Sequence, residues 1–140
     1  MKERKVIHAI DEALQDRLGR CFELSGKYVA SNPSWDLVHA VITDKKFGTG
    51  GTLTHAWCEK GDEAYDPVME HRYPKTLTYS LYGVVDYKVN PYEKRMGTPE
   101  TLKVTYTSSE AREHMIESGT YGPWDKRIDN YKCKVGKKQK

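Results

Sequence analysis

Hydrophobic residues near the start of the chain recur at intervals of three and four residues. The residues with this spacing are Ile7, Ile10, Leu14 and Leu18. The spacing predicts a helix over 7–18, with acidic residues in its first turns, where a helix N-terminus favours them. A second helix is expected from Cys21 to about Ala30, because Pro33 and the residue before it disfavour helical backbone.

The pattern then changes to that of strands. Residues 35–42 are rich in β-branched side chains, and residues 53–59 alternate between polar and apolar positions, so both predict strands. The glycines of 48–51 indicate a flexible turn between them. A Lys-Gly-Asp turn at 60–62 precedes Tyr65, which is expected to open a short third strand.

The second half of the chain carries fewer clear signals. The segment 74–89 fits either a helix around 76–82 or a strand over 84–89, and the sequence leaves both open. A strand is expected over 102–106. Residues 107–110 form a capping-box pattern, which predicts a short helix ending at Gly119. An aromatic turn follows at 121–124.

These elements together predict an α+β fold, with N-terminal helices packed on an antiparallel sheet. A chain of 140 residues has the length of one domain, expected here to be 1–131. Residues 132–140 form a basic segment that we expect to be a disordered tail.

Charge and cysteine usage narrow the function classes. The net charge of +3 comes largely from the lysine-rich tail rather than from a basic folded face, so nucleic acid is not an expected partner. No apolar run has the length of a signal peptide or membrane span, which favours a cytoplasmic protein without membrane contact. Three cysteines without paired spacing argue against a disulfide framework and for a reducing compartment.

Three residues stand in an order and context that suit thiol chemistry. Cys21 opens a predicted helix, His55 lies on a predicted strand and Asp66 follows on the next one. A helix N-terminus, the adjacent Arg20 and a paired imidazole would favour the reactive thiolate of Cys21. His55 would then act as general base and Asp66 would orient its ring.

The segments that carry these residues resemble the core of bacterial and phage transglutaminase-like and papain-like cysteine enzymes. The resemblance covers about residues 15–68 and rests on the cysteine segment, the His-Ala-Trp strand and the Tyr-Asp-Pro strand. It implies a papain-like or transglutaminase-like fold, without a cofactor. It also implies that Gln15, six residues before Cys21, donates a hydrogen bond to the oxyanion of the reaction.

Each candidate also has an ordinary structural interpretation. Cys21 could simply pack its helix as a small hydrophobic residue. Trp57 is expected in the core beneath His55, with a cleft wall as the alternative, and Cys58 should point to the opposite face of the strand. His39 is expected to be a partly buried structural residue. A metal site is not expected, because the alternation separates His55 from Cys58.

Two functions follow from this reading. The first is a thiol-dependent hydrolase or acyl transferase that acts on an amide-type bond in a peptide, a protein or a small molecule, through a thioester intermediate. The alternative is a catalytically inactive binding protein on the same fold. Peptide hydrolysis, deamidation and amine transfer remain open, as does the oligomeric state.

Overall fold

The computed structural model describes residues 20–43 and 52–131 of the chain. The predicted helix over 7–18, the glycine turn at 48–51 and the tail at 132–140 lie outside the described residues. The account of the fold below is confined to the two described ranges.

A five-stranded sheet forms the centre of the molecule. Its strands are β1 (Asp36–Thr43), β2 (Thr52–Lys60), β3 (Glu63–Asp66), β4 (His71–Pro74) and β5 (Lys103–Tyr106). The spatial order is β4-β3-β2-β1-β5, and every neighbouring pair is antiparallel. The predicted α+β class and its antiparallel sheet are therefore confirmed.

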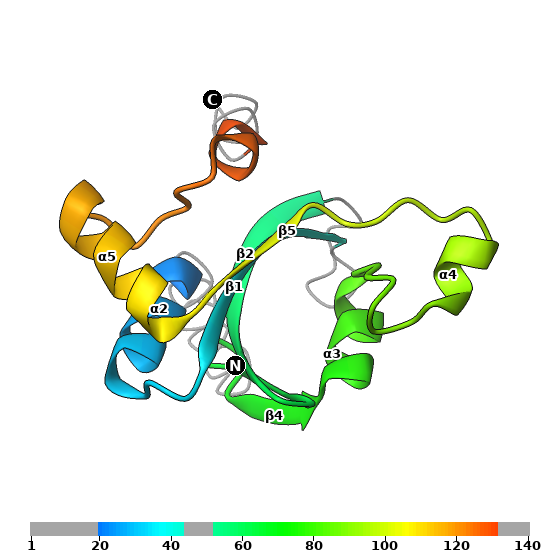
Figure 1. Cartoon of the computed structure of the whole chain (residues 1–140), viewed down its shortest axis with the longest axis horizontal. Coiled ribbons are helices and arrows are strands. Elements are labelled where there is room, and N and C mark those ends of the chain that lie inside the picture. Colours follow the sequence, from blue (N-terminus) through cyan, green and yellow to red (C-terminus); the bar gives the residue numbers. More distant parts are fainter. Residues whose placement is uncertain (1–19, 44–51, 132–140) are drawn as a thin grey trace, which may run out of the picture.

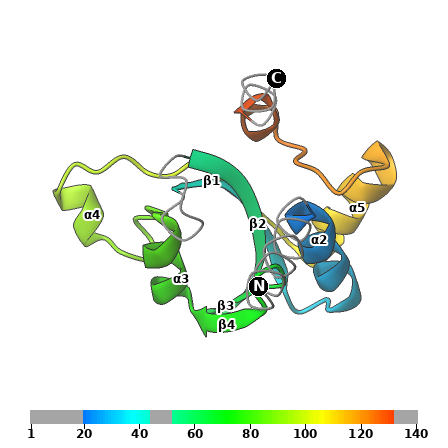
Figure 2. The ribbon, with the colours of Figure 1, turned by 180° about the vertical axis from the view of Figure 1, so that it is seen from behind.

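Helices cover both faces of this sheet. The helices of the described chain include α2 (Cys21–Ser31), α3 (Lys75–Tyr82), α4 (Tyr92–Arg95) and α5 (Ser108–Ser118), and a further helical segment lies at 126–131. Figures 1 and 2 show α2 and α5 together on one face and α3 on the other. The helix α4 lies at the far end of an extended connection between α3 and β5, and none of its residues is buried (Figure 1).

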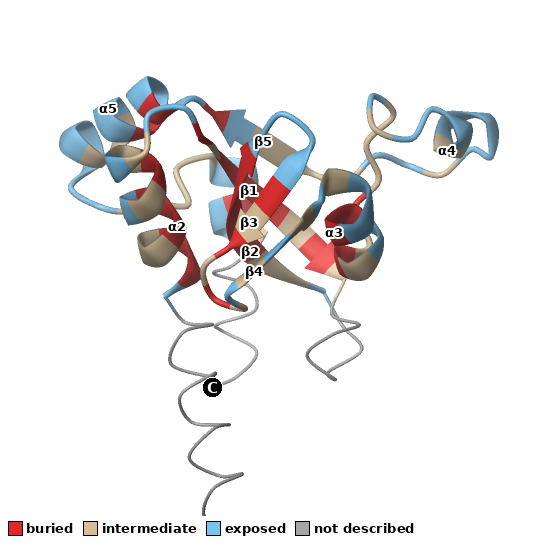
Figure 3. Cartoon of the chain, turned by 90° about the horizontal axis from the view of Figure 1, so that it is seen from below, coloured by how far each residue is buried: buried red, intermediate tan, exposed pale blue. Residues whose placement is uncertain are grey.

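Two hydrophobic layers follow from this arrangement, one on each face of the sheet. Beneath α3, the buried side chains are Val38, Ala40, Ile42, Trp57, Ala64, Tyr79, Tyr82 and Val84. Beneath α2 and α5, they are Val29, Trp35, Leu37, Cys58, Tyr106 and Ala111. Figure 3 shows the buried residues concentrated on the sheet and on the inner sides of the helices. Because strand residues alternate between faces, Trp57 and Cys58 of β2 belong to different layers.

Several local predictions are confirmed. The helix that begins at Cys21 ends at Ser31, one residue later than expected. The capping box is formed: the Glu110 amide donates to the Thr107 hydroxyl at 3.1 Å, and the Thr107 amide donates to the Glu110 carboxylate at 2.9 Å. The helix ends at Gly119 with φ of 69°.

The structure decides between the helix and the strand that the sequence of 74–89 left open. Residues 75–82 form the helix α3, whereas 84–89 form no strand. The strand β4 was not expected. It pairs with β3 after a turn in which the Glu70 amide donates to the Asp66 carbonyl at 2.8 Å. The short helix α4 was also not expected.

Gly83 ends α3 in a tight position. Its φ is 63°, and a Cβ atom added there would lie 2.8 Å from the Thr43 Cβ of β1. We expect Gly83→Ala to lower the free energy of unfolding by about 2–4 kcal/mol, since left-handed backbone and steric overlap both oppose the side chain. Gly97→Ala is the matched control: its φ is 74°, but nothing lies within 4 Å of the added atom. Equal losses in urea denaturation would show that the contact with Thr43 has no effect.

Candidate functional site

Cys21 is the first residue of α2 and lies where this helix meets the sheet. Its side chain is 3% exposed and packs with Phe22, with Ala56 of β2 and with Val68 in the turn after β3. No side chain of a described residue caps the start of this helix. The first backbone amides of α2 therefore lie beside the thiol without a side-chain acceptor from the described residues. The helix therefore presents its positive end next to Cys21.

His55 lies on β2 beyond the residues that pair with β3. The β2–β3 ladder covers only 58–60 of β2, which leaves the His55 stretch past the end of β3. The start of α2 approaches the ring there, and the Cys21 side chain is near enough to raise the pKa of His55. The other side of the ring contacts Asp66, with 2.7 Å between His55 Nε2 and Asp66 Oδ2. Because Nε2 is engaged by Asp66, Nδ1 is the nitrogen that remains for the thiol.

Asp66 ends β3 and is almost completely buried. Its Oδ1 accepts hydrogen bonds from the backbone amides of Val68 at 2.8 Å and Met69 at 3.2 Å. Its Oδ2 accepts from the His55 ring and from the Tyr82 hydroxyl. One carboxylate thus caps the turn after β3 and also accepts a hydrogen bond from the imidazole.

The electrostatics of the pair favour its ionised form. Burial alone would favour a neutral His55, but the Asp66 charge, its hydrogen bond and the electrostatic effect of Cys21 together raise the pKa of His55 to about 10. Burial likewise works to raise the pKa of Asp66, yet the His55 charge and hydrogen bonds from His55, Tyr82 and Met69 lower it below its ordinary value. The site therefore holds an imidazolium beside a carboxylate at neutral pH.

Tyr82 is a site residue that the sequence did not reveal. It is 1% exposed, ends α3 and donates its hydroxyl to Asp66 Oδ2. Its ring meets the His55 ring edge to face, with 5.3 Å between centroids. Tyr82 lies in the segment 74–89, whose sequence fitted either a helix or a strand. That pattern does not identify Tyr82 as a hydrogen-bond partner of Asp66.

Trp57 lies in the core beside His55, as expected from its position on β2. Its side chain is fully buried and its ring is stacked on the His55 ring, with 6.2 Å between centroids. Its Nε1 donates to Glu59 at 2.9 Å, and Glu59 also accepts from the Tyr79 hydroxyl at 2.5 Å. The structure gives Trp57 no exposed surface with which to form the alternative, a cleft wall.

The other candidate ligands and bases lie apart from Cys21, His55 and Asp66. Cys58 points to the opposite face of β2, where its Sγ lies 3.5 Å from the Ser25 carbonyl oxygen. His39 is fully buried rather than partly buried, and its ring contacts Phe22, Tyr106 and Trp124. Within 20–43 and 52–131, no group of three or more histidine, cysteine and acidic residues is arranged to hold a metal ion.

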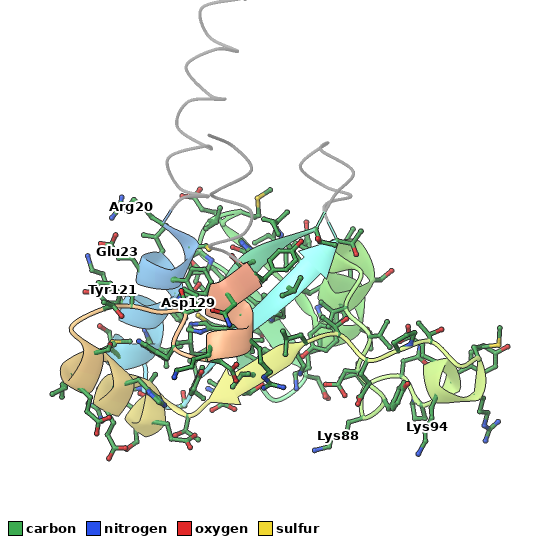
Figure 4. The ribbon with its side chains drawn as sticks, turned by 90° about the horizontal axis from the view of Figure 1, so that it is seen from above. Arg20, Glu23, Lys88, Lys94, Tyr121 and Asp129 are labelled. Carbon is green, nitrogen blue, oxygen red and sulfur yellow. The ribbon has the colours of Figure 1, made fainter. Side chains whose placement is uncertain are left out.

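The surroundings of the thiol combine apolar side chains with charges. Leu24, Met69 and Tyr121 are partly buried and pack against the cluster that contains Cys21. Arg20 and Glu23 form an ion pair of 3.0 Å on the outer side of α2. Figure 4 shows these two residues and Tyr121 on the same side of the molecule, far from Lys88 and Lys94.

One cavity of about 640 Å³ lies away from this site. Its lining residues come from the end of β1, from α3 and from the connection to α4, and they include Tyr79, Asp86 and Glu93. None of the three candidate catalytic residues lines it. Gln15, expected from the family resemblance as an oxyanion donor, lies outside the described residues.

Comparisons with known proteins do not identify a function for this site, so we interpret it from its geometry. No helix in the described part of the chain is long and apolar enough to span a membrane. Searches of protein-family models, of curated proteins and of solved structures found no match to this chain.

Proposed function

We propose that the chain is a thiol-dependent hydrolase or acyl transferase that acts on an amide-type bond. The observation that supports this proposal is the placement of three side chains: the Cys21 thiol acts electrostatically on the His55 ring, and that ring is hydrogen-bonded to the Asp66 carboxylate. Nucleophile, base and orienting group are thereby neighbours, which nucleophilic catalysis requires. The layout also supports a papain-like or transglutaminase-like core.

The proposed reaction uses the charges of the pair. The Cys21 thiolate attacks the amide carbonyl carbon, forming a carbon–sulfur bond and an oxyanion. Backbone amides at the start of α2 are donors for that oxyanion. The His55 imidazolium gives its proton to the leaving nitrogen, and the carbon–nitrogen bond breaks to leave a thioester.

Resolution of the thioester regenerates the enzyme. Water or an amine attacks the carbonyl carbon while neutral His55 takes its proton, and the carbon–sulfur bond breaks to restore the Cys21 thiolate and the imidazolium. Asp66 stays ionised throughout and stabilises the imidazolium. Water as the nucleophile makes the protein a hydrolase, and an amine makes it a transferase.

Selective alkylation tests this proposal without a known substrate. At pH 6, iodoacetamide should modify Cys21 at least about tenfold faster than Cys58, since Cys21 lies at the start of α2 beside the His55 ring. Burial raises the pKa of Cys58 above its ordinary value, so Cys58 serves as the internal control. Site-resolved mass spectrometry of the folded protein measures both rates.

The control variant is His55→Gln, which keeps a side-chain donor for Asp66 but removes the imidazole. It should abolish the advantage of Cys21 while circular dichroism shows an unchanged fold. Equal rates at Cys21 and Cys58 in the wild-type chain would contradict the enzyme proposal.

A second candidate function is binding without catalysis on the same fold. The 3% exposure of Cys21 favours it, because a nucleophile must be reached by its substrate. In that case Cys21 would resist iodoacetamide as strongly as Cys58 does, so the same experiment decides between the two functions.

A further inference from the structure

The carboxylate of Asp66 is shared among more groups than an orienting residue requires. Two backbone amides occupy Oδ1, and both His55 and Tyr82 bind Oδ2. The Tyr82 hydroxyl and the His55 ring therefore donate to the same oxygen atom. Any change at the hydroxyl acts on the oxygen that holds the imidazolium.

The position of Tyr82 is fixed from several directions. Its ring contacts His55 at 5.3 Å and Trp57 at 5.5 Å between centroids. Gly83, directly after it, closes α3 through a hydrogen bond from its amide to the Ser80 carbonyl at 3.4 Å. The phenol therefore has little freedom to turn away from Asp66.

We propose that Tyr82 is a positioning residue of the thiol site: its hydroxyl holds Asp66 ionised and in place, and through Asp66 it keeps the His55 imidazolium next to Cys21. This inference rests on the proposed function. Burial, together with the charge of Asp66, raises the pKa of Tyr82 above its ordinary value, so the phenol keeps the proton that it donates. A hydrogen bond to a carboxylate stabilises the charged form of that carboxylate.

Titratable groups from three other elements surround Asp66 and Tyr82. Those that act on the pair electrostatically or lie opposite it in the sheet are Cys21 from α2, His55 and Cys58 from β2, and His71 and Tyr73 from β4. Of these, only His55 is a hydrogen-bond donor to Oδ2 besides Tyr82 in the described bonds. The test must therefore report on Asp66 itself.

Tyr79 gives a matched control on the same helix. It is 3% exposed, and its hydroxyl also donates to a buried carboxylate, that of Glu59. Tyr79→Phe and Tyr82→Phe therefore remove the same kind of hydrogen bond from the same helix, but only the second removes it from the thiol site. The two variants should lose similar amounts of thermal stability.

The experiment combines two measurements on the full chain. In protein labelled with carbon-13 at the aspartate carboxyl, the Asp66 resonance is assigned by its loss in Asp66→Asn and followed against pH. Tyr82→Phe should move its titration upward by about one pH unit or more, since a charge-assisted hydrogen bond is lost. It should also slow iodoacetamide modification of Cys21 at pH 6 by severalfold. Tyr79→Phe should change neither value.

The outcomes separate this inference from the proposed function. If wild-type Cys21 shows no selective labelling, the proposed function fails, and the positioning role fails with it. If the wild type is selective but Tyr82→Phe behaves like Tyr79→Phe in either measurement, the positioning role alone is overturned.

A measurement on the wild type covers the case in which Tyr82→Phe does not fold. In the wild-type protein, the Tyr82 hydroxyl proton should exchange slowly with solvent, and its NMR chemical shift should follow the titration of Asp66. A rapidly exchanging hydroxyl would overturn the inference.

Discussion

Asp66→Asn should lower the rate of Cys21 alkylation at pH 6 by at least about tenfold and reduce turnover by several orders of magnitude once a substrate is known. The asparagine oxygen can keep the bonds to the Val68 and Met69 amides, while its amide nitrogen replaces the oxygen that faces His55. That nitrogen donates to Nε2 and so places the imidazole proton on Nδ1, toward the thiol. The ring then no longer accepts a proton from Cys21.

Asp86→Asn is the control for this substitution. Asp86 also accepts from a backbone amide, that of Lys88 at 2.8 Å, and pairs with a cation, Lys103, at 2.7 Å. The change in charge is the same, but Asp86 lies in the connection between α3 and β5, and its partners Lys88 and Lys103 do not belong to the Cys21 site. A similar fall in Cys21 alkylation in both variants would show that the loss reflects general destabilisation instead of the orientation of His55.

The stability of the protein should depend on pH through the buried pair of His55 and Asp66. The folded pKa of His55, about 10, lies above the ordinary value of 6.5. The folded chain therefore binds more protons in this interval, and the contribution of His55 is complete below about pH 6.5 and is lost as pH rises toward 10. We expect the wild type to lose about 2–4 kcal/mol of unfolding free energy between pH 6 and 9.5 from this group.

Asp66 acts at the opposite end of the range. Its pKa is lowered in the folded state, so its contribution to stability is present above about pH 4 and is lost as pH falls further.

The loss of stability at alkaline pH is measured by urea denaturation of the wild type and of His55→Gln at pH 6, 8 and 9.5. The difference between the two proteins should shrink steadily with pH. A constant difference would mean that His55 is not an imidazolium in the folded protein.

The sequence predicted those parts of the fold that depend on local signals. The helix that starts at Cys21, the alternating strand around His55 and the capping box at Thr107 each carry a pattern that neighbouring residues determine. The strand β4 lacks such a pattern. Among the described strands, its four residues pair with β3 alone, and the turn that directs them there contains the hydrogen bond from the Glu70 amide to the Asp66 carbonyl.

The candidate site was predictable to the extent that its members lie on recognisable elements. Cys21, His55 and Asp66 were chosen for their order and contexts, and the structure brings them together. Tyr82 could not be chosen, because its hydroxyl reaches Asp66 only after α3 packs on the face of the sheet opposite α2. That packing joins residues from distant parts of the chain, which no local pattern encodes.

The double use of Asp66 has a consequence for how this protein could diverge. A descendant without the proposed activity would still need the side-chain oxygen of an aspartate or asparagine at position 66, because Oδ1 closes the turn after β3 through two backbone amides. Drift would therefore remove Cys21 or His55 before it removed that oxygen. Among related sequences, aspartate or asparagine here would mark a shared fold, and the cysteine–histidine pair would mark a lineage that keeps the proposed activity.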